Sequence, residues 1–284
     1  MIRYSIFRKS LRDQRWQSLG FGLALMAMSS TSVLLWPSAR DALQQFELPK
    51  AVQAFLGSKL SIATAAGYLS ARYFGWVEIL LIVYAVIQGT GAIAGEESAG
   101  TIDLLLSQPV RRADIVLQKC VAFVCGLTVA VGLGVLGFAA AIPFVRIDVS
   151  IADTAIASAN MLPMILLFFA FALWAGAVAP NRGAAAGLSV GVATAAYFIN
   201  TLATGVESLQ NLKYATPFYY YGAGLPLVQG VSLPHVGLLM GATVGLAALA
   251  LAIFDRRDLG AGSGVELKLP GLLRRPNSHA VTDP

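Results

Sequence analysis

Residues 160–204 form the stretch that decides the fold. They read NMLPMILLFFAFALWAGAVAPNRGAAAGLSVGVATAAYFINTLAT and contain a single charged residue, Arg182. A helix of about 20 apolar residues crosses the roughly 30 Å hydrocarbon layer of a bilayer. The stretch therefore holds two membrane spans, residues 160–179 and 184–204. The proline and the glycine in residues 180–183 stop one helix and open the next, so the sequence predicts a tight antiparallel hairpin.

Composition extends this interpretation to the whole chain of 284 residues. Hydrophobic residues make up 57% of it, without counting its 28 glycines, and charged residues make up 12%. A soluble domain carries about twice that share of charge, and it could not bury so much apolar surface. A soluble enzyme and a disordered chain are therefore excluded. We expect an all-α membrane protein with six transmembrane helices, at residues 17–35, 76–95, 120–142, 160–179, 184–204 and 234–254.

The distribution of basic residues predicts the orientation. With the N-terminus inside, fourteen of the 20 Lys and Arg residues fall in inner segments and six in outer segments. The positive-inside rule then places both termini in the cytoplasm of a multi-pass protein of the cell membrane. No basic run is interleaved with stacking aromatic residues, so nucleic-acid binding is not expected.

Residues 1–16 have the pattern of an amphipathic interfacial helix. Apolar side chains share one helical face and arginines share another, which suits a helix on the inner leaflet with its basic side towards lipid headgroups. The alternative is a basic flank that only sets topology. The six-helix domain spans residues 17–259. A short helix is expected around residues 50–60 of the outer segment 36–75, and residues 260–284 are expected to form a flexible cytoplasmic tail.

The inner loop of residues 96–119 is the most informative segment. Two acidic residues follow the second span directly, and a short helical stretch then places Ile102, Leu105 and Leu106 on one face. Pro109 ends this stretch because proline disfavours helix in the residue before it. A stiff helix with an apolar face under the membrane could dock into a groove on a cytosolic partner. An ordinary loop with interfacial leucines is the alternative.

This loop resembles that of the permease subunits of ABC-2-type exporters. The shared pattern is an acidic pair, a Gly-Thr, a Leu-rich turn, a Ser-x-Pro-Val, a basic residue and a Lys that enters the third span. Here it is Glu96-Glu97, Gly100-Thr101, Leu104 to Leu106, Ser107-Gln108-Pro109-Val110, Arg112 and Lys119. The resemblance covers about residues 1 to 260. Arg111 departs from it, since the family often has a small hydroxyl residue there.

The resemblance implies the partners and a site. Such permeases work as dimers, with a second copy or a paralogue, and each binds a cytosolic ABC ATP-binding subunit. The loop would be the coupling element that senses closure of those subunits. Its expected working residues are Glu96, Glu97, Gly100, Thr101, Leu104, Leu105, Pro109 and Arg112. Short helices in residues 205–233 would cap the exit, and spans two and five would face the centre. The expected substrate path there is formed by Tyr84, Gln88, Tyr197 and Asn200.

The chain offers no chemistry of its own. It has no Gly-x4-Gly-Lys-Ser/Thr phosphate loop, so ATP and Mg²⁺ are expected on the partner subunit and no cofactor on this chain. Its two histidines lie far along the sequence from its two cysteines, so neither a metal site nor a catalytic site is expected.

Two alternatives to an exporter remain. One is a non-transporting membrane partner of an ATPase that transmits force or a signal. The other is an ion-coupled secondary transporter, which would need an ionisable residue deep in the spans. Glu78 is expected at the outer surface, near Arg72, so that requirement is not met. The largely uncharged spans favour an amphipathic or lipid-like substrate.

Overall fold

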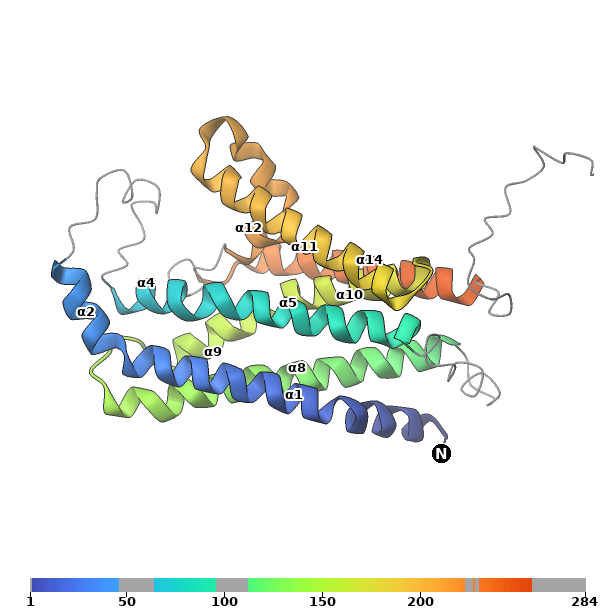
Figure 1. The fold of residues 1–284 in the computed structure, drawn as a ribbon, viewed down its shortest axis with the longest axis horizontal. Coiled ribbons are helices and arrows are strands. Elements are labelled where there is room, and N and C mark those ends of the chain that lie inside the picture. Colours follow the sequence, from blue (N-terminus) through green and yellow to red (C-terminus); the bar gives the residue numbers. More distant parts are fainter. Residues whose placement is uncertain (1, 46–63, 96–111, 223–226, 228–229, 257–284) are drawn as a thin grey trace, which may run out of the picture.

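The computed structural model describes residues 2–45, 64–95, 112–222, 227 and 230–256 (Figure 1). Its described residues form helices and no strands, which confirms the all-α prediction. The elements are α1 (Ile2–Leu34), α2 (Trp36–Gln45), α4 (Ala65–Leu69), η1 (Ser70–Phe74), α5 (Gly75–Thr90), η2 (Gly91–Gly95), α8 (Arg112–Ala141), η3 (Ile142–Phe144), α9 (Ile151–Asn160), α10 (Leu162–Val178), α11 (Arg182–Gly205), η4 (Glu207–Ala215), α12 (Pro217–Tyr221) and α14 (Leu233–Arg256).

Five helical stretches in the described residues are long and apolar enough to cross a membrane, and α1 with α2 makes a sixth if that bent pair is one span. The five lie at Ala65–Gly95, Ala113–Phe144, Ile151–Val178, Arg182–Gly205 and Leu233–Asp255. Each contains one of the predicted spans or nearly all of it. The helix predicted around residues 50–60 and the predicted tail lie outside the described residues.

The N-terminal region differs from the expectation. The predicted interfacial helix and the first span form one continuous helix, α1, because no proline interrupts residues 2–34. The break comes later, at Leu35, where α1 and α2 meet at 49°. Pro37 accounts for it, since proline lacks an amide hydrogen and its ring clashes with the carbonyl group four residues earlier.

Side-chain caps fix where two helices begin. Asn181 precedes α11, and its Oδ1 accepts a hydrogen bond of 2.9 Å from the amide of Ala184. Ser150 and Asp153 form a reciprocal capping box at the start of α9. α9 and α10 together make one span of 28 residues, longer than the predicted 160–179. The cap at Ser150 explains the earlier start, because it satisfies amides that a helix start leaves unpaired.

Helices α1 and α8 pack side by side and run parallel. Small residues make the close approach possible: Gly126 faces Ser18, Gly134 faces Leu25 and Gly137 faces Met26. The hydroxyl of Ser30 donates to the carbonyl oxygen of Gly137 at 3.1 Å. Small residues and hydroxyl hydrogen bonds of this kind hold helices together where lipid supplies no hydrophobic driving force.

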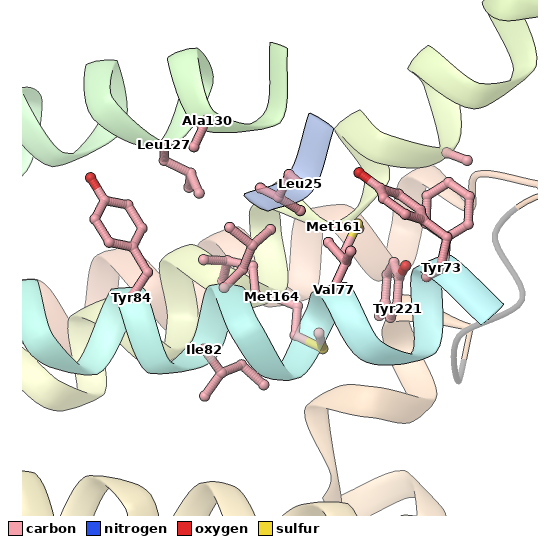
Figure 2. Packing of buried hydrophobic residues seen from close by; sticks show 14 of the residues in the cluster. Leu25, Tyr73, Val77, Ile82, Tyr84, Leu127, Ala130, Met161, Met164 and Tyr221 are labelled. Carbon is pink, nitrogen blue, oxygen red and sulfur yellow. The ribbon is translucent and has the colours of Figure 1, made fainter. Parts of the chain in front are cut away.

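Apolar side chains from α1, α5, α8, α9 and α10 meet in one core, and Figure 2 shows Tyr84, Leu25 and Leu127 within it. The rings of Phe123 and Phe169 stack with centroids 4.0 Å apart, and Tyr84 packs against Phe123. α11 and α14 are peripheral. In the most apolar part of α11 only 22% of the residues are buried, and in that of α14 only 11%. Both helices therefore present long apolar faces to lipid or another subunit.

Several chain segments end together. The start of α1, the end of η2, the start of α8, the α10–α11 turn and the end of α14 lie at one end of the bundle, at the right in Figure 1. We call this the loop end, because residues 96–111 connect η2 to α8 there. The positive-inside rule predicts that it faces the cytoplasm.

Candidate functional site

Most of the predicted coupling residues lie outside the described part of the chain. These are Glu96, Glu97, Gly100, Thr101, Leu104, Leu105 and Pro109. Arg112 is the first residue of α8. The structure instead describes the two helix ends from which the loop leaves and to which it returns, η2 and α8.

Two basic side chains hold these helix ends. Lys119 on α8 donates from Nζ to the carbonyl oxygen of Ala92 in η2 at 2.9 Å. Arg182, the first residue of α11, donates from Nη2 to the carbonyl oxygen of Ile87 at 3.4 Å. The Ile87 carbonyl oxygen also accepts from the amide of Gly91, so Arg182 is a second donor to it. Carbonyl groups near the C-terminal end of a helix carry partial negative charge, so cations are favourable there. The two bonds therefore join the end of span two to the starts of α8 and α11.

The absence of side chains on two glycines brings Arg182 close. A Cβ atom at Gly91 would lie 3.4 Å from its Nη2, and one at Gly95 would lie 3.8 Å from its Cδ. Both glycines belong to η2, a π-helical turn. Such turns widen the helix and are frequent at functional sites. The guanidinium therefore lies along η2, beside Gly91 and Gly95.

A polar cavity of about 400 Å³ opens beside this joint, between α1, α5, α8, α10 and α11. We call it the junction cavity. It is lined by Lys9, Ser10, Asp13, Gln14, Gln17, Ile87, Gln88, Gly91, Ala92, Gly95, Lys119, Ala122, Phe123, Phe169 and Arg182. The sequence alone does not reveal it, because its polar residues come from four helices, α1, α5, α8 and α11, that only the packing brings together.

The four predicted path residues fall into two groups. Tyr84 is fully buried, and its hydroxyl shares a hydrogen bond of 2.8 Å with Ser18. Gln88 donates to Gln17 Oε1 at 2.8 Å and lines the junction cavity. Both therefore contact α1.

The other two residues contact the segment after α11. The ring of Tyr197 packs against Phe218 of α12 with centroids 5.6 Å apart. The Oδ1 atom of Asn200 accepts from Thr216 at 3.1 Å. Tyr84 and Gln88 thus face α1, whereas Tyr197 and Asn200 hold the predicted exit cap.

Glu78 corrects an expectation. It is only 4% exposed rather than at the surface, and its Oε2 has no hydrogen-bond partner among the described residues. Tyr221 of α12 is buried nearby, and burial followed by the charges of Glu78 and Tyr73 raises the pKa of the Tyr221 hydroxyl well above its usual value. That hydroxyl therefore stays protonated. The prediction failed because the packing of the bundle buries this part of α5, where Tyr221, far along the sequence, lies close to the helix (Figure 2).

The described residues contain no group of three or more His, Cys, Asp or Glu side chains that could hold a metal ion. The site therefore consists of helix ends, cations and a polar cavity in a bundle of membrane helices.

Comparison with known proteins agrees with this architecture. The sequence model of a family described as "ABC-2 family transporter protein" matches residues 5–259. A search of curated proteins finds no match to the chain. The match includes every described helix except the first residues of α1, as well as the loop between η2 and α8. The chain is therefore a multi-pass membrane protein that belongs to the ABC-2 transporter family, as a non-catalytic transmembrane subunit of an ABC transporter.

Proposed function

We propose that this chain is the permease subunit of an ABC exporter, driven by ATP that a separate cytosolic subunit hydrolyses. The observation that carries the proposal is the joint at the loop end. Lys119 and Arg182 tie the carbonyl groups at the end of span two to α8 and α11. A displacement of residues 96–111 would therefore reach three helices at once.

Four residues of the loop have a proposed role. Glu97 anchors the loop electrostatically, Gly100 permits close approach of the ATPase, Leu105 is the docking knob and Pro109 fixes the bend. Closure of two ATPase subunits pushes the loop, and the helices attached to it switch the path from inward to outward access.

A second permease subunit completes the path. The apolar faces of α11 and α14 are largely uncovered in the single chain, which supports a dimer seam in this part of the bundle. The described spans contain few charges on these faces, so an amphipathic or lipid-like substrate fits better than a small ion.

The experiment is a mild-detergent pull-down of the tagged chain, co-expressed with its neighbouring genes, followed by an ATPase assay. A stoichiometric partner with a Walker motif is expected. Leu105→Asp should remove it, because a charge cannot enter an apolar groove without a large desolvation cost. Leu212→Asp is the matched control, since Leu212 is exposed on η4 at the other end of the bundle. A stable chain without an ATPase partner would refute the proposal.

Gly100→Arg tests transport itself. It should abolish export while membrane insertion and protein level stay normal, because the long side chain keeps the ATPase from closing on the loop. Normal export by this variant would remove the coupling role from residues 96–119.

Glu78 supports a second candidate, an ion-coupled secondary transporter. A buried carboxyl group in a span is the kind of residue that carries protons in such proteins. Proteoliposomes of the purified chain should then move substrate under an imposed pH gradient without ATP, and Glu78→Gln should stop this movement. Transport that needs ATP and survives Glu78→Gln would rule this candidate out.

A further inference from the structure

Three buried polar atoms without hydrogen-bond partners lie towards the end of the bundle opposite the loop end. They are Ser70 Oγ in η1, Glu78 Oε2 in α5 and the Tyr221 hydroxyl in α12, and none of them has a hydrogen bond to a described residue. Ser70, Glu78 and Tyr221 are 0%, 4% and 1% exposed. We call these three residues the Glu78 group. Buried polar atoms without partners are rare in natural proteins, so each one calls for a physical reason.

The members of the Glu78 group come together from two parts of the chain. Ser70, Tyr73 and Glu78 are spaced i, i+3 and i+8, so they lie along roughly one stripe of the helix that η1 and α5 form. Figure 2 shows Tyr221 beside this helix, near Tyr73. The Tyr221 hydroxyl is close enough to Glu78 and Tyr73 for their charges to raise its pKa. Packing therefore places a tyrosine hydroxyl near an isolated carboxyl group.

No described cation is placed to pair with Glu78. The elements that pack on α5 are η1, η2, α1, α10 and α11. Among them η2, α10 and residues 16–34 of α1 contain no ionisable side chain. The ionisable residues of η1 and α11 are Arg72, Tyr73, Arg182 and Tyr197. Arg72 is exposed, and Arg182 begins α11 at the loop end, so the carboxyl group meets tyrosines rather than cations.

The surroundings of Glu78 determine its protonation state. An ionised carboxylate at this position would be a buried charge without a cation, which has a large desolvation cost. Glu78 is therefore a neutral acid in this arrangement, with a proton on its carboxyl group. A proton needs no cavity of its own, which suits a side chain that is almost completely buried. Loss of the proton would create a charge that only water or a new donor could stabilise.

α12 is the neighbouring element that can move at the lowest cost. It has five residues, whereas α5 and α10 have 16 and 17. Its last residue is held through a long hydrogen bond of 3.3 Å, from Asn160 Nδ2 to the carbonyl oxygen of Tyr221. Phe218 packs its ring against that of Phe168 of α10. Displacing α12 would disturb these contacts and leave the long spans in place.

We propose that Glu78 is a proton-binding site that fastens α12 to the bundle, and that loss of its proton releases α12. The neutral acid tolerates burial beside Tyr221, whereas the carboxylate requires water, so α12 moves away to admit it. The arrangement in this structure is therefore favoured at low pH and weakens as the pH rises. The inference needs neither an ATPase nor transport of a substrate, so its test is separate from those of the two candidate functions.

The first test measures the protonation state of Glu78 in the purified full chain by infrared spectroscopy. At about pH 6 exposed carboxyl groups are ionised, so a protonated carboxyl band reports a buried acid. The parent should show such a band that is missing from Glu78→Gln, and the band should weaken as the pH rises. This measurement needs no reporter group.

The second test measures whether the Glu78 group opens to water. Ser70→Cys places a thiol in the group, and Ser70 Oγ has no hydrogen bond to lose. Cys120 and Cys125 are replaced by alanine in every variant. A charged methanethiosulfonate reagent should label this thiol about tenfold faster at about pH 9 than at about pH 6, after division by the rate for Leu212→Cys, which is exposed. With Glu78→Gln added, the ratio should stay within about twofold.

Three added variants assign the pH response. Glu78→Asp should keep it, because a carboxyl group remains. His235→Gln should also keep it, although it removes a histidine that packs against two tyrosines of α12, and histidine is the usual pH sensor of proteins. Tyr221→Ala should allow fast labelling of Ser70→Cys at both pH values, because the covering ring is gone. Size-exclusion profiles that match the parent show that each variant is folded.

Several results would overturn the proposal. A missing protonated band at about pH 6 would show that Glu78 is ionised inside the bundle. A response that persists in Glu78→Gln, or that disappears in His235→Gln, would place the sensor elsewhere. A Ser70→Cys thiol that stays unlabelled in Tyr221→Ala would show that α12 does not cover the Glu78 group.

Discussion

Replacement of Gly137 by alanine should push α1 and α8 apart. A Cβ atom at this position would lie 2.5 Å from the carbonyl oxygen of Met26 and 3.0 Å from its Cα. Ordinary van der Waals contact begins at 3.4 Å, so the oxygen is 0.9 Å too close. Backbone atoms cannot rotate away, and the helices themselves must separate. Ser30 would then also lose its hydrogen bond to the Gly137 carbonyl oxygen.

Three contributions change the free energy of unfolding of this variant, and the size of each is known. Overpacking costs about 1–3 kcal/mol, and this contact with rigid backbone belongs at the upper end. An interhelical hydrogen bond in a membrane protein contributes about 0.6 kcal/mol. Replacing a helical glycine by alanine returns roughly 0.5–1 kcal/mol. Gly137→Ala should therefore lower the free energy of unfolding by about 2 kcal/mol.

Gly132 provides the matched control within the same helix. Nothing lies within 4 Å of a Cβ atom placed there. Gly132→Ala should therefore only gain the roughly 0.5–1 kcal/mol by which alanine favours a helix over glycine. The assay is unfolding in mixed micelles with increasing dodecyl sulfate, followed by tryptophan fluorescence. Gly137→Ala should unfold at a lower sulfate fraction than the parent, and Gly132→Ala at an equal or higher one. If the two variants unfold together, the close approach of α1 and α8 is wrong.

Variants at three further positions test single side chains by the same unfolding assay or by hydrogen exchange. Asn181→Ala should cost about 1 kcal/mol by removing the cap of α11, whereas Asn181→Asp should keep it; equal stability of the two would contradict the capping role. Lys119→Met should speed amide exchange in η2 about fivefold, by the loss of about 1 kcal/mol at the helix end, and Lys119→Arg should restore protection. Unchanged exchange in Lys119→Met would mean that this lysine does not hold η2. Glu78→Gln should be at least as stable as the parent, because an amide fills the same buried site without charge. A large loss of stability would instead reveal a partner for the carboxylate.

Much of the fold follows from local sequence. Uninterrupted apolar length predicts the spans, and the hairpin of α10 and α11 lies where residues 180–183 predict it. The exact start of α11 depends on the cap at Asn181. The prediction rested on the neighbouring proline and glycine and did not use this residue. The joining of the first sixteen residues to the first span also follows a local rule, since a helix continues until something such as Pro37 stops it.

The site could be predicted only in part, because its chemistry is tertiary. The loop pattern is local, and it indicated where coupling would occur. Lys119 was visible as a basic residue entering a span, but its acceptor, the Ala92 carbonyl, depends on how η2 packs. Gln14 and Glu78 look ordinary in the sequence, and only the packing of neighbouring helices buries them.

The parallel contact of α1 and α8 has a mechanical consequence. Residues 96–111 leave η2, which packs on α10, and return to α8, which packs on α1. Residues 96–111 thus connect two helix pairs, α5 with α10 and α1 with α8, which Lys119 also joins through its hydrogen bond to Ala92. If these residues transmit force from an ATPase, as proposed, we expect the two pairs to move relative to each other along the plane where Phe123 of α8 stacks on Phe169 of α10. A stacked aromatic pair contributes about 0.5–1.5 kcal/mol beyond its buried area, so this ring pair would help to set the free energy of such a movement.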